Sequence, residues 1–190
     1  CSVVSMDLEQ SWCPSPTFKL IRGGSVLDDS RSRYTFGEKL DEGVYGEVYE
    51  DFRSGRPLAV KFIKACETAR SDAAAEAYVL DRCRGHPHIV QLVDVFRGTS
   101  PKGTASEYAL VFEHAGVALT SLIRRKIMSY QAVRFAMADI VSGVEHIHAL
   151  GLVHGDLKPC NVLARGVGGF DAGVSDSWHV KVADVGLALL

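Results

Sequence analysis

The chain has 190 residues, of which 47% are hydrophobic and 23% charged, and its 21 Lys and Arg against 23 Asp and Glu give a net charge of -2. This length supports a sizeable hydrophobic core, and the composition excludes a disordered chain. Because no excess of cations is present to neutralise a phosphate backbone, we expect no nucleic-acid partner.

The cysteines and the hydropathy pattern predict a location. The five cysteines are odd in number, scattered and without a CxxC pair, which favours a reducing, intracellular compartment, the cytoplasm first and the nucleus not excluded. No apolar run approaches the roughly 18 residues of a membrane span, and the start lacks a signal-peptide pattern. We therefore expect a soluble protein without a membrane span; the oligomeric state has no signal in the sequence.

Turn signals divide the first part of the chain. Residues 1–33 are rich in Ser and carry two prolines and a glycine pair, which predicts a loose N-terminal extension. From Tyr34, short β-prone runs alternate with glycine-bearing turns and enclose one helical segment. The sequence predicts a five-stranded antiparallel sheet with one helix. The predicted strands are 34–40, 47–52, 58–63, 89–96 and 108–112, and the predicted helix is 68–82.

The pattern becomes helical from Ser129 to Gly151. Its apolar positions recur at helical spacing and predict one buried stripe. The members of this stripe are Val133, Ala136, Met137, Ile140, Val144 and Ile147. Two short strands are predicted at 161–164 and 179–183, and the glycine-bearing segment 165–178 between them is expected to be an exposed loop insertion.

Two weak chemical signals lie in the first part of the chain. The turn at 40–48 carries Gly43 and Gly46, which would let backbone N–H groups approach phosphate oxygens, although such a hairpin is by default only a turn. Lys61 lies on a predicted strand and Glu76 on the following helix, so Glu76 could partner a buried lysine. A strand lysine by itself is more often a solvated surface charge.

A sharper signal follows the long helix. Asp156, Lys158 and Asn161 bring a carboxylate, a cation and an amide within six residues. Such groups can accept a hydroxyl proton, neutralise a transferring phosphoryl group and hold a divalent metal. Asp184, beside Val185 and a glycine after the last predicted strand, adds a carboxylate suited to magnesium.

These motifs, in this order, resemble the eukaryotic protein kinases over residues 34–190. The resemblance implies an α+β, two-lobe fold, with an N-lobe and hinge at 34–115 and a partial helical C-lobe at 116–190. It implies ATP and Mg²⁺ as cofactors and a protein hydroxyl as the phosphate acceptor. Lys158-Pro159 after the aspartate is similar to the serine/threonine branch.

The resemblance also assigns roles to single residues. Asp156 would accept the substrate proton, and Glu76 would hold Lys61 against the ATP phosphates. The expected catalytic residues are Asp156, Lys158, Lys61 and Glu76, and the expected metal ligands are Asn161 and Asp184. The expected ATP-binding residues are Leu40, Gly43, Gly46, Val48, Ala59, Lys61, Phe112, Glu113, Ala115 and Leu163.

Several features depart from the family pattern. Asp41 stands in place of a loop glycine and adds a Cβ and a charge near the nucleotide; Gly155 replaces the arginine that reads activation-loop phosphorylation. Val185 replaces a phenylalanine and shrinks the apolar group behind the N-lobe helix.

Because the sequence stops at Leu190, we expect a fragment of a larger kinase that binds magnesium nucleotide weakly and does not phosphorylate protein by itself.

Two other functions stay open. Small-molecule phosphotransferases of kinase-like fold often carry His-Gly-Asp, as at 154–156, although Lys158-Pro159 and the compact hinge argue against them. A pseudokinase-like nucleotide-binding scaffold would fit Asp41 and Val185. Joint retention of five chemically active residues argues against it, namely Lys61, Glu76, Asp156, Asn161 and Asp184.

Some remaining polar residues have weaker signals. His86 and His88, and likewise His146 and His148, are spaced as candidate metal pairs, but no third ligand lies nearby in sequence. We expect these to be turn and helix-face histidines. Trp178 is expected in a loop.

Overall fold

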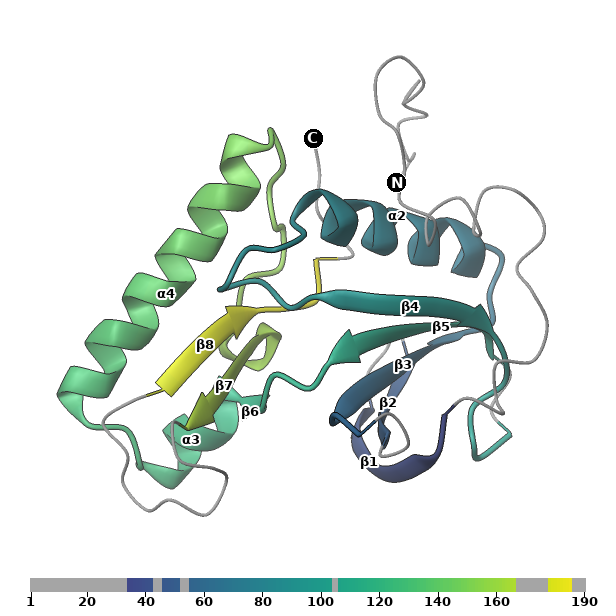
Figure 1. The fold of residues 1–190 in the computed structure, drawn as a ribbon, viewed down its shortest axis with the longest axis horizontal. Helices are drawn as coiled ribbons and strands as arrows, with labels where there is room; N and C mark the ends of the chain where they lie inside the picture. Colours follow the sequence, from purple (N-terminus) through teal and green to yellow (C-terminus); the bar gives the residue numbers. More distant parts are fainter. Residues whose placement is uncertain (1–33, 43–45, 52–54, 104–105, 167–177, 186–190) are drawn as a thin grey trace.

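The structure, a computed structural model, describes residues 34–42, 46–51, 55–103, 106–166 and 178–185. Its first half is the five-stranded antiparallel sheet that the sequence predicts, and its strands lie in the order β1-β2-β3-β5-β4 (Figure 1). The strands are β1 (Phe36–Glu42), β2 (Gly46–Asp51), β3 (Leu58–Lys64), β4 (Leu92–Arg97) and β5 (Ser106–Glu113).

The side chains of the central strand β3 alternate between the two faces of this sheet. Val60 and Phe62 point to one face, where the Phe62 ring meets the Tyr49 and Phe96 rings edge to face at 5.9 and 6.1 Å. Since strand side chains alternate, Lys61 points to the opposite face. The aromatic cluster thus fixes which face Lys61 occupies.

Helix α2 (Ala69–Arg82) packs on β5, on the face of the sheet that carries Lys61 (Figure 1). Its positions Ala73, Ala77 and Leu80 are buried at helical spacing, and the two alanines allow close approach to the strands. Cys83 follows the last residue of the helix as its C-cap, and burial raises the pKa of its thiol to about 11. This thiol therefore stays protonated and inert near neutral pH.

The second half is a small antiparallel sheet with two helices. Strands β6 (Val117–Ala118), β7 (Val162–Gly166) and β8 (Trp178–Val182) are ordered β6-β7-β8. Helices α3 (Leu119–Arg125) and α4 (Tyr130–Ala149) and a 3-10 turn, η2 (Pro159–Asn161), complete it, and α4 runs along β8 (Figure 1). Ser129 caps the N-terminus of α4, because its hydroxyl accepts a hydrogen bond from Ala132 N at 3.1 Å.

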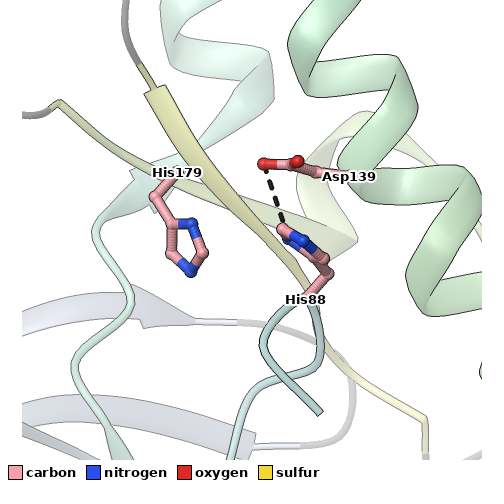
Figure 2. A group of neighbouring side chains, drawn as sticks. All are labelled: His88, Asp139 and His179. Atoms are coloured by element: carbon pink, nitrogen blue, oxygen red, sulfur yellow. Dashed lines mark ion pairs between the residues drawn. The ribbon is translucent and has the colours of Figure 1, made fainter.

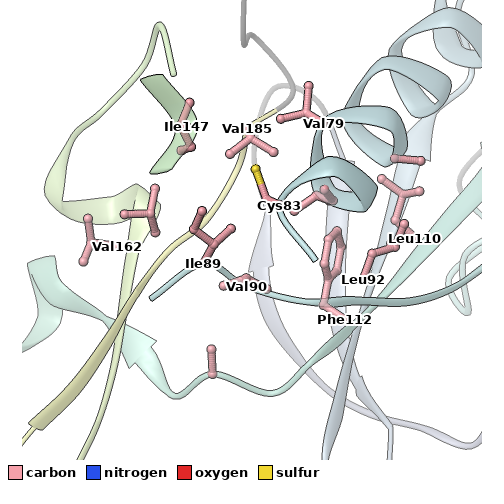
Figure 3. Packing of buried hydrophobic residues seen from close by; sticks show 14 of the residues in the cluster. Val79, Cys83, Ile89, Val90, Leu92, Leu110, Phe112, Ile147, Val162 and Val185 are labelled. Atoms are coloured by element: carbon pink, nitrogen blue, oxygen red, sulfur yellow. The ribbon is translucent and has the colours of Figure 1, made fainter. Parts of the chain in front are cut away.

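A short parallel bridge joins the two halves. Val90 N donates to Val182 O and Val182 N to His88 O, each at 2.9 Å, and these bonds tie the loop before β4 to β8. Ile89, in this loop, and Ile147, on α4, are fully buried in the same hydrophobic cluster (Figure 3). The core is therefore continuous from the large sheet to α4.

Several predicted bounds are wrong by a few residues. The first strand begins at Phe36 rather than at 34 and continues to Glu42. The fourth begins at Leu92 rather than at 89, because Ile89 pairs with Val182 of β8 instead of β5. Strand β6 and helix α3 were not predicted, since both are too short to display a hydrophobic period.

The apolar stripe predicted for α4 is split. Val133 and Met137 are 44% and 52% exposed, contrary to the prediction. Small residues lie on the buried side instead, because other backbone approaches the helix; a Cβ on Gly143 would lie 2.7 Å from His88 O. The buried positions are Ala132, Ala136, Ile140, Gly143 and Ile147.

Some predictions concern residues outside the described ranges. These are the extension at 1–33, the turn residue Gly43, the part of the expected loop at 167–177, and residues 186–190. Trp178, expected in a loop, instead begins β8. Among the helices that the structure describes, none has the length and apolar character needed to cross a membrane.

Gly116, between β5 and β6, requires glycine for two reasons. Its φ is +107°, and a Cβ would lie 2.2 Å from Ala164 O. We expect Gly116→Ala to lower the free energy of unfolding by about 3 kcal/mol, measured by urea denaturation. Gly151→Ala is the matched control, because Gly151 has φ +75° with nothing within 4 Å of the added Cβ. It should cost about 1 kcal/mol, and equal losses would contradict the steric argument.

Candidate active site

A cavity of about 470 Å³ lies where the two sheets meet, within the usual size of small-molecule sites. Most of the predicted site residues line it, including side chains from the strands of both sheets. These are Leu40, Gly46, Val48, Ala59, Lys61, Glu76, Phe112, Glu113, Ala115, Asn161, Leu163 and Asp184. Asp156 and Lys158 are not among the lining residues, and Gly43 lies outside the described ranges. Asp41 and Cys160 also line the cavity.

Lys61 forms the predicted ion pair with Glu76. Its Nζ donates to Glu76 Oε1 and Oε2 at 3.0 and 2.8 Å, and also to Asp184 Oδ1 at 2.7 Å. Burial lowers the pKa of Lys61, but the Glu76 and Asp184 carboxylates raise it by more, so its pKa lies above the ordinary value. Burial in turn raises the pKa of Glu76, and Lys61 opposes this. Because two carboxylates share one ammonium, the group has a net negative charge that favours binding of an additional cation.

Asp184 is held in an unusual backbone conformation. Its φ is 58°, and in the described part of the chain the other non-glycine residue with positive φ is Lys126, which caps α3. The preceding residue is fixed on both sides, since Ala183 N donates to Asn161 O and His154 Nε2 donates to Ala183 O, each at 2.9 Å. Such strain persists where surrounding contacts over-determine it, and it aims Asp184 at Lys61.

The loop at 154–161 folds around the Asp156 side chain. Asn161 Nδ2 donates to Asp156 O and Oδ2 at 2.9 and 3.0 Å, and Lys158 Nζ donates to Asp156 Oδ2 at 2.6 Å. The hydrogen bond from Lys158 lowers the pKa of Asp156. Asp156 is therefore a carboxylate near neutral pH. Because the amide nitrogen of Asn161 is hydrogen-bonded to Asp156, the Oδ1 atom of Asn161 is available to a cation.

His154 is a buried residue beside Asp156 to which the sequence analysis assigns no role. It is 3% exposed, and its Nδ1 accepts from Asp156 N at 3.3 Å. The proton of the ring therefore lies on Nε2, which donates to Ala183 O. His154 thus links the loop carrying Asp156 to the segment carrying Asp184. Adjacency to Asp156 was the available sequence signal, but the contact 29 residues away was not visible in it.

The backbone of residues 113–115, the hinge between the sheets, presents an unused donor. Glu113 N donates to Gln91 O at 3.1 Å and His114 N to Pro57 O at 3.2 Å. Over the described ranges, the Ala115 N–H has no such partner, and Ala115 lines the cavity. It is therefore available to a ligand acceptor.

The Glu113 side chain supports the hinge. Its Oε1 accepts from Lys181 Nζ at 2.6 Å and from Gln91 N at 2.9 Å. These bonds connect the hinge to β8 and to the loop before β4. The side chain of Glu113 is therefore engaged with protein partners.

Gly46 has a packing reason to be glycine. A Cβ there would lie 2.1 Å from Phe62 O on the neighbouring strand. The pairing of β2 with β3 therefore requires glycine at this position with or without a phosphate nearby. Gly46 alone is not a specific signal for a nucleotide.

His114 makes stability depend on pH. Burial lowers the pKa of His114, Glu50 opposes this, and Arg165 adds to it. A histidine whose pKa is lowered by folding stabilises the protein above the unfolded value and loses that contribution as pH falls. We expect the difference in Tm between the wild type and His114→Gln to shrink from about pH 7.5 to about pH 5.5. Thermal denaturation measures it, with the exposed His148→Gln as control; a pH-independent difference for His114→Gln would contradict this.

The comparison with known proteins decides the family. Residues 34–190 match the family described as the protein kinase domain. The chain belongs to the protein kinase family. The match confirms the resemblance and the α+β fold with its five-stranded N-lobe sheet.

Individual relatives agree with this kinase assignment. The chain is 36% identical over 156 residues to CBL-interacting protein kinase 22 of Oryza sativa subsp. japonica, covering 70% of this chain and 33% of the relative. It is 32% identical over 173 residues to the carbon catabolite-derepressing protein kinase of Candida glabrata, covering 86% and 25%. It is 31% identical over 161 residues to cyclin-dependent kinase B2-1 of Arabidopsis thaliana, covering 80% and 48%. The chain thus spans a quarter to a half of these relatives.

Proposed function

We propose that this kinase chain binds ATP with Mg²⁺ in the cavity and serves an enzyme that transfers the γ-phosphate to a serine or threonine hydroxyl of a protein. The observation that carries the proposal is the contact of Lys61 with both Glu76 and Asp184 at the cavity wall. A cation held by two carboxylates beside a small-molecule cavity suits a phosphate chain and its metal ion.

The base and the phosphates have distinct partners. The apolar side chains Val48, Ala59 and Leu163 line the cavity and suit the two faces of a flat heterocycle, and the Ala115 N–H suits its acceptor edge. Lys61 is the cation for the phosphates. Leu40, Gly46, Phe112 and Glu113 complete the proposed nucleotide site.

The proposed metal ligands fit magnesium chemically. Asn161 Oδ1 and the Asp184 carboxylate are hard oxygen donors, and both residues line the cavity. The net negative charge of the Lys61, Glu76 and Asp184 group favours a divalent cation. Bound Mg²⁺ would neutralise charge on the phosphates.

The loop at 154–161 would hold the substrate hydroxyl that accepts the phosphate. Asp156, ionised and held by Lys158 and Asn161, would orient the substrate hydroxyl and accept its proton. Lys158 would stabilise the transferring phosphoryl group. The serine/threonine preference rests on Lys158-Pro159.

We further propose that residues 34–115 form the N-lobe and hinge and 116–190 the start of the C-lobe.

A nucleotide-binding scaffold is the second candidate. Asp41 lines the cavity and adds a negative charge on the side of β1 and β2. This charge would weaken phosphate binding without affecting the adenine side.

The function is tested with protein expressed from its complete coding sequence. The protein is incubated with γ-labelled ATP, Mg²⁺ and peptide libraries that contain serine, threonine or tyrosine. We expect Mg²⁺-dependent transfer of the label to serine or threonine peptides. Nucleotide binding without transfer to any peptide would favour the scaffold, and transfer to a small-molecule alcohol would favour a phosphotransferase.

A further inference from the structure

Three potential metal ligands meet away from the cavity (Figure 2). They are His88 in the loop before β4, Asp139 on α4 and His179 on β8, and one ligand atom from each lies within 4.8 Å of the other two. None of the three lines the cavity. The group therefore has no part in the proposed nucleotide site.

The spacing of these atoms is close to that of a zinc site. His88 Nδ1 lies 3.4 Å from Asp139 Oδ2. Metal bonds of about 2.0–2.1 Å in a tetrahedron place neighbouring ligand atoms about 3.3 Å apart. His179 is exposed, so a rotamer change can bring its ring nitrogen to the same separation.

The backbone of β8 fixes the other two ligands. Asp139 Oδ2 accepts from Val180 N at 3.1 Å, which orients the carboxylate. His88 Nδ1 lies 3.1 Å from Val180 O. To offer Nδ1 to an ion, neutral His88 must carry its proton on Nε2. It then loses the hydrogen bond from Nδ1 to Val180 O, and this loss lowers the affinity for the ion.

We propose that His88, Asp139 and His179 bind a divalent first-row transition ion, Zn²⁺ in the first place. Two imidazoles and one carboxylate are a ligand set for such ions, and water would complete the coordination. The ion would join three elements that are distant in sequence. The bound ion would therefore stabilise the packing of β8 on α4. Because β8 leads directly to Asp184, this packing also supports the position of Asp184.

Neighbouring histidines are the competing ligands. The His86 ring lies 5.9 Å from the His88 ring and stacks on the His146 ring at 4.6 Å. His146 Nε2 is buried and has no hydrogen-bond partner among the described residues. A metal held by His86 and His146 would be a different site, and the experiment must separate the two.

The test is a Co²⁺ titration of the 190-residue chain in excess Mg²⁺, followed by visible absorption and by competition with Zn²⁺. Excess Mg²⁺ occupies oxygen-only sites. We expect one ion per chain. His179→Ala and Asp139→Asn should each weaken binding by about tenfold or more. His179 is exposed, and Asn at 139 can still accept from Val180 N, so both variants should keep the wild-type circular dichroism. His148→Ala, an exposed histidine of α4, is the matched control and should bind like the wild type.

Zinc should also raise the Tm of the wild type and of His148→Ala but not of His179→Ala. The proposal is overturned if no ion binds, or if both ligand variants retain wild-type affinity. Loss with His146→Ala while Asp139→Asn binds normally would assign the ion to the histidine pair and overturn it. Thiolate-to-cobalt charge-transfer bands would assign it to cysteines, with the same consequence.

Discussion

Asp156→Asn is expected to slow phosphotransfer by about 10³-fold, the usual scale for loss of a general base. The amide keeps an oxygen that can accept from Lys158 and Asn161, so the loop should stay folded, but it cannot take the substrate proton. Asp156 does not line the cavity, so nucleotide affinity should change little. Initial rates of the protein expressed from its complete coding sequence, with γ-labelled ATP and a serine peptide, measure the effect.

The control for this variant is Glu145→Gln, which removes an exposed carboxylate from α4 outside the site. It should retain the wild-type rate. A rate for Asp156→Asn within a few-fold of the wild type would show that another group accepts the proton, and the assignment of Asp156 would be abandoned.

Lys61→Met is expected to lower the free energy of unfolding by about 3 kcal/mol, because it removes one partner of a buried charge group. Glu76 is 4% exposed, and without Lys61 its carboxylate would face Asp184 with no cation between them. Urea denaturation measures the loss. The change should also abolish magnesium-nucleotide binding.

A second substitution separates charge from packing. Adding Glu76→Gln to Lys61→Met removes the uncompensated carboxylate and should recover much of the lost stability. Lys102→Met, at an exposed position outside the cavity lining, is the control and should cost little. No recovery in the double variant would mean that the loss came from packing and not from an unpaired charge.

Local pattern predicted most of the fold. The strand containing Lys61 and the helix containing Glu76 are consecutive, so their ion pair followed from 15 residues of sequence. The third partner, Asp184, lies 123 residues from Lys61 and could not be derived from spacing. Its place depends on the packing of β8 against the loop before β4.

Contacts between distant segments account for what the sequence did not predict. Sequence spacing pairs His88 with His86 and offers no third ligand, because Asp139 and His179 come from other elements. The buried face of α4 differs from the predicted stripe for the same reason, since Gly143 is buried by the approach of His88 O and not by its own hydrophobicity. The strain at Asp184 likewise has no sequence signal.

The most direct test of the nucleotide site is a calorimetric titration of the 190-residue chain with a non-hydrolysable ATP analogue, with and without Mg²⁺. We expect one nucleotide per chain, bound more tightly with Mg²⁺, with binding lost in Lys61→Met and in Asp184→Asn and retained in Glu145→Gln. Absence of binding, or binding that Lys61→Met and Asp184→Asn leave unchanged, would rule out the proposed nucleotide site.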